Sequence, residues 1–166
     1  MRWLIDGYNV IRRDPELHAH EAQSLEAGRA ALLRLLARLA SRVSDDFTAV
    51  FDGGRRGGGA PSPGRVQVVF SRPPETADDV LRRLAASLRE GAVVVTSDRA
   101  VQDSARRTGA VAVSAEAFVQ AAEDPDDRTD DDGEDEDVPA PRRGPSRRPS
   151  REARDAARVL RRLRSG

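Results

Sequence analysis

The chain has 166 residues, no cysteine and no lysine, and its 28 arginines balance 28 acidic residues. This length predicts one domain of ordinary size with its own hydrophobic core. The lack of cysteine excludes disulfide bridges, thiolate metal sites and cysteine nucleophiles. No apolar run approaches the roughly 20 residues that span a bilayer, and Asp6 interrupts the first apolar run too early for a signal peptide. We therefore expect a cytoplasmic protein without a membrane segment.

The formal net charge of zero is a cancellation between three blocks of the chain. Residues 1–122 carry 17 arginines and 15 acidic residues, 123–137 carry 11 acidic residues and 1 arginine, and 138–166 carry 10 arginines and 2 acidic residues. Blocks of like charge are usually solvated and mobile. We predict a domain over 1–122, a disordered linker over 123–149 that is first acidic and then rich in proline and arginine, and a basic helical tail after it, over 150–166.

Short apolar runs alternate with helical patterns through most of the chain, which is typical of a βαβ fold. In chain order, we expect a strand over 3–5, a helix over 24–43, strands over 47–51 and 66–70, a helix over 75–90, a strand over 93–95, a helix over 100–107, a strand over 111–113, and helices over 115–122 and 151–164. The run 93–95 is continuously apolar, as in a parallel strand that is buried on both faces. The pattern predicts an α/β sandwich with a mostly parallel sheet of about five strands.

Aspartates follow three of the expected strands, at Asp6, Asp52 and Asp98. Because ligands bind beyond the carboxyl ends of strands in open parallel sheets, we expect these carboxylates to meet at one rim. A fourth comes from the helix after the third strand. At about 100° per residue, the apolar stripe of this helix leaves Asp78 at its edge and points Asp79 away, so Asp78 is the better ligand. Alternatively, both are only first-turn acids, which the helix dipole favours.

Crowded carboxylates repel one another unless a cation lies among them. Hard oxygen ligands without histidine or cysteine favour Mg²⁺ or Mn²⁺ over zinc. A metal-dependent nuclease fits such a rim, because bound ions activate water and stabilise charge on the leaving oxygen. Arg55 and Arg56, in the glycine-rich segment after Asp52, would steer a phosphate backbone towards the rim. Alternatively, these arginines only keep that segment soluble.

Other motifs indicate little chemistry. The glycine-rich run 53–59 lacks both the Lys-Ser/Thr ending of a phosphate-binding loop and the GxGxxG spacing, so we expect no nucleotide cofactor. We expect His18 and His20 to be surface residues. For Tyr8, two roles stay open: stacking on a base or filling the core beside the first strand.

Four short motifs in series resemble a known family. Residues 4–11 (LIDGYNVI) resemble the opening signature of NYN domains, a branch of the PIN-like nucleases, and residues 51–53 (FDG), 75–79 (ETADD) and 95–99 (VTSDR) follow in the order and spacing of its YacP-like members. The resemblance covers about residues 1–122. It implies a Rossmann-like PIN fold, which is a three-layer sandwich, together with a divalent metal site and endoribonuclease activity.

The resemblance also implies roles for single residues. Three carboxylates would bind the metal: Asp6, Asp78 and Asp98. Asn9 would support the site from the first motif. Asp52 would be a further carboxylate of the site or would contact the metal ligands without binding the metal itself. The residues that we expect to contact RNA lie in or beside these motifs: Tyr8, Arg55, Arg56 and Arg99.

The sequence therefore predicts a Mg²⁺- or Mn²⁺-dependent endoribonuclease that cleaves single-stranded RNA, in mRNA turnover or on ribosome-bound mRNA. Two other functions stay open: a catalytically weak RNA-binding module of the same fold, and a DNA flap-type nuclease. Three roles stay open for the arginine-rich tail, which would dock on RNA or the ribosome, fold back onto the acidic run 123–137, or remain solvated.

Overall fold

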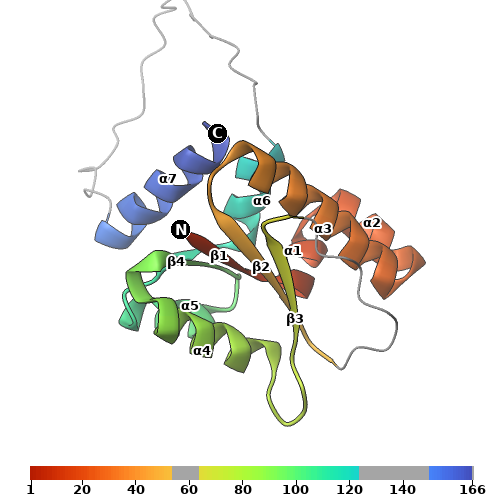
Figure 1. The fold of residues 1–166 in the computed structure, drawn as a ribbon, viewed down its shortest axis with the longest axis horizontal. Coiled ribbons are helices and arrows are strands. Elements are labelled where there is room, and N and C mark those ends of the chain that lie inside the picture. The colour runs from red at the N-terminus through yellow and green to blue at the C-terminus, as the bar shows by residue number, and fades with distance from the viewer. Residues whose placement is uncertain (54–63, 124–149, 166) are drawn as a thin grey trace, which may run out of the picture.

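The computed structural model describes residues 1–53, 64–123 and 150–165, and within them the chain forms an α/β sandwich (Figure 1). The sheet has five strands in the order β3-β2-β1-β4-β5, and every neighbouring pair is parallel. The strands are β1 (Arg2–Asp6), β2 (Asp46–Phe51), β3 (Val66–Phe70), β4 (Ala92–Val95) and β5 (Val111–Val113). The predicted fold class and all five predicted strands are confirmed.

Seven α-helices lie in the described residues: α1 (Gly7–Arg13), α2 (Pro15–Gln23), α3 (Leu25–Arg42), α4 (Ala77–Leu88), α5 (Arg99–Arg107), α6 (Ala115–Glu123) and α7 (Arg151–Arg164). A short 3₁₀ turn, Arg89–Gly91, follows α4. The helices expected from the sequence are confirmed, but α1 and α2 were not expected. Of the α2 residues only Leu17 is buried, so no apolar periodicity marked this helix.

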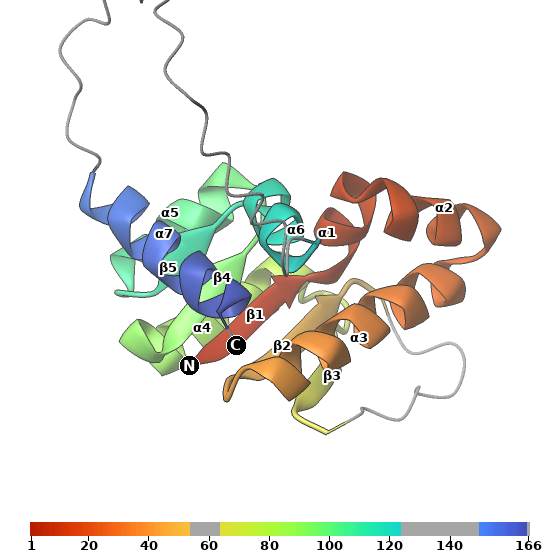
Figure 2. The same cartoon turned by 90° about the horizontal axis from the view of Figure 1, so that it is seen from above.

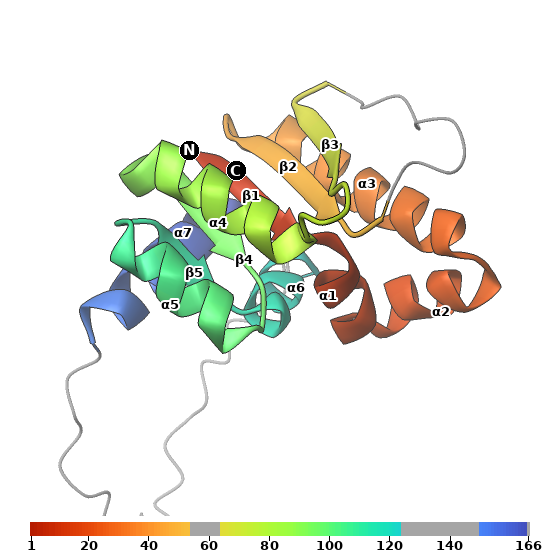
Figure 3. The ribbon, with the colours of Figure 1, turned by 90° about the horizontal axis from the view of Figure 1, so that it is seen from below.

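The helices cover both faces of the sheet. Helices α4 and α5 pack on one face, while α1, α3, α6 and α7 lie on the other, with α2 against α1 and α3 (Figures 2 and 3). Side chains of β1 alternate between the two layers, since Trp3 and Ile5 belong to one core cluster and Leu4 to the other. This burial on both faces explains the continuously apolar strands.

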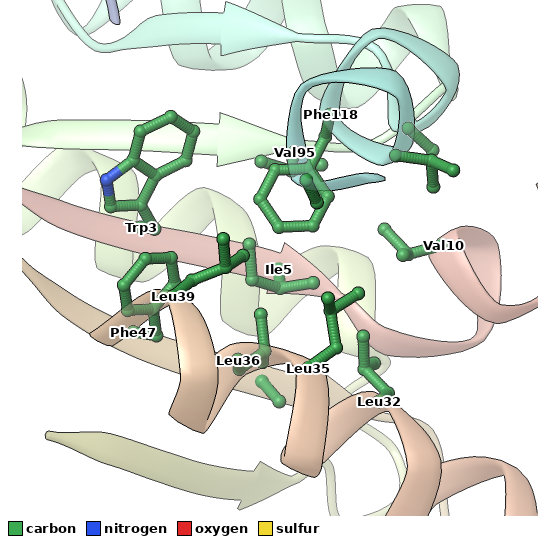
Figure 4. Packing of buried hydrophobic residues seen from close by; sticks show 14 of the residues in the cluster. Trp3, Ile5, Val10, Leu32, Leu35, Leu36, Leu39, Phe47, Val95 and Phe118 are labelled. Atoms are coloured by element: carbon green, nitrogen blue, oxygen red, sulfur yellow. The ribbon is translucent and has the colours of Figure 1, made fainter. Parts of the chain in front are cut away.

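The larger core cluster lies between the sheet and α3 and α6 (Figure 4). Trp3 stacks on Phe47 with ring centroids 5.9 Å apart, and Phe118 of α6 approaches Trp3 at the same separation. Leu36 and Leu39 of α3 are fully or almost fully buried in the same cluster. The core therefore fixes the strands rigidly, which sets the positions of the residues at their carboxyl ends.

The arginine-rich helix α7 packs against β5 and α6. Its apolar stripe is used in this contact, because Val159 and Leu163 are 2% and 1% exposed. Arg162 also binds the buried carboxylate of Asp45, with 2.9 Å between Nη2 and Oδ1. The division into a domain over 1–122, a linker over 123–149 and a tail over 150–166 stays a prediction, and nearly all of the linker lies outside the described residues.

Among the described residues, no helix combines the length and the apolar character that a membrane crossing requires.

Candidate functional site

Asp6 and Asp98 each end one element and begin the next. Asp6 is the last residue of β1 and caps α1, where its Oδ1 accepts a hydrogen bond of 3.4 Å from the Asn9 N–H. Asp98 follows β4 and caps α5, accepting 3.0 Å from the Val101 N–H. Because β1 and β4 pair in parallel up to Ile5 and Val95, both aspartates leave the sheet at adjacent strand ends.

The buried side chain of Thr96 connects these two aspartates. Its hydroxyl donates a hydrogen bond of 2.8 Å to Asp6 Oδ2 and accepts one of 3.2 Å from the Asp98 N–H. The Thr96 carbonyl accepts a further bond of 2.7 Å from Gln102 of α5. Thr96 was not among the residues expected at the site, although it lies in the fourth motif between the end of β4 and Asp98, which caps α5.

Asn9 holds the turn between β4 and α5 from the outside. Its Oδ1 accepts a hydrogen bond of 2.9 Å from the Ser97 N–H. Ser97 in turn donates from its hydroxyl to Glu116 Oε2 at 2.5 Å, and Glu116 forms an ion pair of 3.1 Å with Arg13. The Ser97 hydrogen bond is the main reason that the pKa of Glu116 lies below its ordinary value. Glu116 was missed, because a first-turn acid of a helix carries no distinctive sequence signal.

Asp52 ties the end of β2 to the start of α4. Its Oδ1 accepts hydrogen bonds from the Ser71 hydroxyl at 3.0 Å and from the Ala77 N–H at 2.6 Å. The second bond fixes the first turn of α4, which contains Asp78. Asp52 therefore holds that turn beside the strand ends while its own side chain stays exposed.

The neighbours Asp78 and Asp79 have different hydrogen-bonding roles. Asp79 takes part in a capping box, in which its Oδ2 accepts 3.1 Å from the Thr76 N–H and the Thr76 hydroxyl caps the Asp79 N–H at 3.3 Å. Asp78 Oδ2 lies 3.9 Å from Arg82 Nη2, and Asp79 pairs with the same arginine at 3.4 Å. The capping role occupies the carboxylate of Asp79 and not that of Asp78, and Asp78 as a metal ligand stays a prediction.

The electrostatics show that these carboxylates are close enough to repel. Burial raises the pKa of Asp6 above its ordinary value of 3.8. Hydrogen bonds from Thr96 and Asn9 lower this pKa, and the negative charges of Asp78 and Asp52 raise it, so that the net shift is upward. Burial also raises the pKa of Asp78, followed by the charge of Asp98. Aspartates from β1, β2, α4 and the β4–α5 turn therefore share one electrostatic environment, which a cation would relieve.

The described carboxylates do not form a complete metal site by themselves. In residues 1–53, 64–123 and 150–165, no three carboxylate, histidine or cysteine groups lie close enough together to hold one metal ion. Mg²⁺ usually keeps several waters and takes only one or two protein carboxylates directly. Oxygen-only donors of this kind would therefore hold Mg²⁺ or Mn²⁺ only if water supplied part of the coordination, and the metal stays a prediction.

The residues expected to contact RNA have different surroundings. Tyr8 is half-buried, its ring meets the edge of Phe51 at 5.2 Å, and its hydroxyl accepts 3.1 Å from Arg29. This packing matches the core-filling role, while base stacking by Tyr8 stays a prediction. Arg99 is exposed at the start of α5. Arg55 and Arg56 lie outside the described residues.

Comparison with known proteins identifies the family. The family model described as YacP-like NYN domain matches residues 3–162. The chain belongs to the YacP-like NYN domain family. The matched range extends from β1 into α7, so the family likeness includes the arginine-rich helix that packs on the sheet. The resemblance carried by the four motifs is confirmed.

Relatives in Bacillus subtilis support the family and its fold. This YacP-like NYN domain is 33% identical over 125 residues to the protein YacP of Bacillus subtilis (strain 168), covering 72% of this chain and 74% of the relative. Crystal structures of Rae1 (YacP) from Bacillus subtilis and of a variant with tryptophan replaced by leucine match with a TM-score of 0.62, 31% and 30% identity, and 74% coverage of each chain. The fold is consistent with that of PIN-like nucleases.

Proposed function

We propose that this YacP-like NYN domain is a Mg²⁺- or Mn²⁺-dependent endoribonuclease that cleaves single-stranded RNA. The observation that carries the proposal is the rim of aspartates at the carboxyl ends of the strands, where burial and like charge raise the pKa of Asp6 and Asp78. Perturbed carboxylates in such a position are typical of sites that do chemistry. Membership of the family supports nuclease chemistry.

The proposed roles follow from the contacts. Asp6, Asp78 and Asp98 would hold the cation partly through its bound water molecules, since no three such groups among the described residues lie close enough to bind one ion directly. When bound, the cation would supply an activated water and stabilise charge on the leaving oxygen. The Thr96 hydroxyl binds Asp6 Oδ2 at 2.8 Å, whereas Oδ1 accepts only the longer bond of 3.4 Å from the Asn9 N–H, so Oδ1 would be the better metal donor. Asn9 keeps the β4–α5 turn in place and thereby orients Asp98.

RNA is the proposed substrate, and exposed Arg99 would contact its phosphates near Asp98, with Tyr8, Arg55 and Arg56 as further contacts. The proposed setting is the cytoplasm, where mRNA, including mRNA on the ribosome, offers single-stranded substrate. No nucleotide cofactor enters the proposal.

The direct test is cleavage of a labelled single-stranded RNA in Mg²⁺, in Mn²⁺ and in EDTA. We expect cleavage by the wild-type protein only with a metal, and a loss of at least about 100-fold in rate for Asp6→Asn and Asp78→Asn, because each removes a charged ligand. Asp79→Asn is the matched control, since its carboxylate serves the capping box. Equal rates for Asp78→Asn and Asp79→Asn would contradict the proposed site.

A second candidate function is RNA binding with weak or no hydrolysis. It is favoured by the lack, among the described side chains, of any three that could hold one metal ion together. In that case RNA binds equally well in EDTA and in Mg²⁺, and no variant changes the background of cleavage. Cleavage of a DNA flap but not of the RNA oligonucleotide would instead indicate a DNA flap-type nuclease.

A further inference from the structure

Arg29 of α3 is the least exposed arginine side chain among the ion pairs of the described residues, at 20%. Its Nη1 donates 3.1 Å to the Tyr8 hydroxyl, and its guanidinium carbon lies 5.5 Å from the centroid of the Phe70 ring. Tyr8 and Phe70 both pack on buried Phe51, at 5.2 and 5.7 Å between ring centroids. The guanidinium is therefore held in one place by a rigid aromatic group.

This aromatic group stands directly beside the carboxylate rim. Tyr8 comes two residues after Asp6, and Phe51 immediately precedes Asp52. Phe70 immediately precedes Ser71, which donates a hydrogen bond to Asp52 at 3.0 Å. Helix α3 packs along β2 and β3 on this side of the sheet (Figure 2). Arg29 is thus tied by short contacts to the same strand ends that carry the aspartates.

The charge of Arg29 is poorly matched by the residues that the structure describes. Arg106 and Arg162 are more exposed, at 31% and 53%, yet each lies 2.9 Å from a carboxylate oxygen. The carboxylate partner of Arg29 is Glu26, 4.0 Å away and itself 71% exposed. A hydroxyl and an aromatic face orient a guanidinium but do not neutralise it. Among the described residues only Tyr8 accepts a hydrogen bond from this guanidinium, and a held cation of this kind suits an incoming anion.

We infer that Arg29, supported by Tyr8 and Phe70, is a phosphodiester-binding residue that holds the RNA strand on the β2–β3 side of the carboxylate rim. The inference rests on the proposed function for the choice of RNA as ligand. A guanidinium fork binds two phosphate oxygens at once, and a fixed cation offsets the repulsion between the strand and the aspartates. Arg29 thus sets where the strand enters the rim and acts on RNA affinity rather than on the chemical step.

Binding is measured by the anisotropy of a labelled single-stranded RNA in EDTA, across a series of salt concentrations, so that no cleavage is needed. The variants are Arg29→Met, Arg29→Lys and, as the control, Arg34→Met, which removes the same charge from an exposed position of α3. We expect Arg29→Met to bind about tenfold more weakly, because one charge-assisted hydrogen-bonded pair is lost. The slope of log affinity against log salt should fall by about 0.7, as for one phosphate contact.

Two comparisons separate this role from a structural one. Arg29→Lys should keep the salt slope of the wild-type protein, since the charge remains, and lose only part of the affinity. Arg34→Met should change the affinity less than about twofold and leave the slope unchanged, because no phosphate contact is removed. A DNA oligonucleotide of the same sequence should lose affinity in the same proportion, since the phosphates are shared.

Three results would overturn the inference. It is wrong if Arg29→Met lowers the melting temperature but keeps the wild-type salt slope, if Arg34→Met has the same effect as Arg29→Met, or if the wild-type protein binds no RNA. Failure of the proposed function has a different signature, in which the slope change at Arg29 is present but no cleavage occurs with Mg²⁺ or Mn²⁺.

Discussion

The Thr96 hydroxyl donates a hydrogen bond of 2.8 Å to Asp6 Oδ2, and the Thr96 hydroxyl oxygen also accepts a hydrogen bond of 3.2 Å from the Asp98 N–H. One buried side chain therefore sets the spacing between a carboxylate of the first motif and the cap that carries a carboxylate of the fourth. The bond also favours the charged form of Asp6 against the effect of burial on its pKa.

Thr96→Val keeps the shape of this side chain and removes both of its hydrogen bonds. We expect it to destabilise the protein by about 1–3 kcal/mol, since a buried carboxylate oxygen and a backbone N–H lose their partner. It should also raise the pKa of Asp6 further and lower the cleavage rate. Urea unfolding and the pH profile of cleavage measure these effects. Thr108→Val is the control, because the Thr108 hydroxyl donates a hydrogen bond to the Ala105 carbonyl at the other end of α5. An unchanged pH profile of cleavage in Thr96→Val would contradict the effect of Thr96 on the pKa of Asp6.

The rim should reduce the stability of the metal-free protein at neutral pH. Between the ordinary value of 3.8 and their raised pKa, Asp6 and Asp78 bind more protons in the folded than in the unfolded chain. Stability therefore falls as pH rises through this window, and the loss is complete above it. Asp78→Asn should raise the melting temperature in EDTA at pH 7, and the gain should disappear at a pH below 3.8.

Asp79→Asn is the matched control for this effect, and its change should have the opposite sign. Hydrogen bonds from Thr76 lower the pKa of Asp79, so its contribution to stability is present above pH 3.8 and is lost as pH falls through the lowered value. Asp79→Asn should therefore lower the melting temperature at pH 7. If both variants shifted the melting temperature in the same direction, the distinction between the two aspartates would be wrong.

Metal should bind the folded protein at the same rim. A ligand that binds only the folded state stabilises it by about 2.7 kcal/mol at a concentration of 100 times its Kd. We expect Mn²⁺ to raise the melting temperature of the wild-type protein and of Asp79→Asn, but much less that of Asp78→Asn, which lacks one of the repelling charges. Calorimetric titration with Mn²⁺ gives the affinity directly. An equal rise in all three proteins would place the metal elsewhere.

Much of the fold could be predicted because short stretches of sequence mark single helices and strands. The continuous apolar run of β4 and the Ser24 cap of α3 each mark an element without reference to the rest of the chain. The apolar stripe of α4 also predicted that Asp79 would not be the ligand, and Asp79 forms the capping box, while the role of Asp78 stays a prediction. The carboxylates of the rim followed from topology alone, because strand ends in a parallel sheet meet at one edge.

The remaining features depend on contacts between distant segments. Helix α2 buries only Leu17, so its stability comes from the Asp14 cap and from packing on α3, which no periodicity reveals. The contact of Arg29 with Tyr8 and Phe70 joins three elements that are far apart in sequence. The packing of α7 could not be read from composition, because charged exposed positions dominate its sequence and Leu163 is one of its few buried residues.

Gly7 should be intolerant of any side chain, because β1 turns into α1 directly against Phe51. A Cβ at this position would lie 2.2 Å from Phe51 Cε1, and Phe51 is fully buried. We expect Gly7→Ala to cost about 1–3 kcal/mol, the usual range for overpacking, and to displace Asp6, so that cleavage falls as well. Gly91→Ala is the control, since nothing lies within 4 Å of a Cβ there, and urea unfolding should show little change or a small gain.

The contact between α7 and the sheet should contribute to the stability of the whole domain. Leu163 is 1% exposed, so Leu163→Ala should cost about 2–5 kcal/mol. Arg158→Met is the surface control, because Arg158 is 72% exposed and, among the described residues, its ion pair is with Asp155 at 3.7 Å. Such a pair contributes about 0–1 kcal/mol. If Leu163→Ala were as stable as Arg158→Met in urea, α7 would not be part of the folded unit.

The ion pair between Arg162 and Asp45 makes this contact dependent on pH. Burial alone would raise the pKa of Asp45, but hydrogen bonds from the Met1 ammonium and Trp3 Nε1 and the charge of Arg162 bring it below the ordinary value of 3.8. Its contribution is therefore present above pH 3.8 and lost as pH falls through the lowered pKa. Arg162→Met should reduce stability at pH 7 and narrow the difference between pH 7 and pH 3. Melting curves of Arg162→Met and Arg158→Met at both values measure this, and identical pH dependence in the two variants would show that Arg162 does not hold α7 through Asp45.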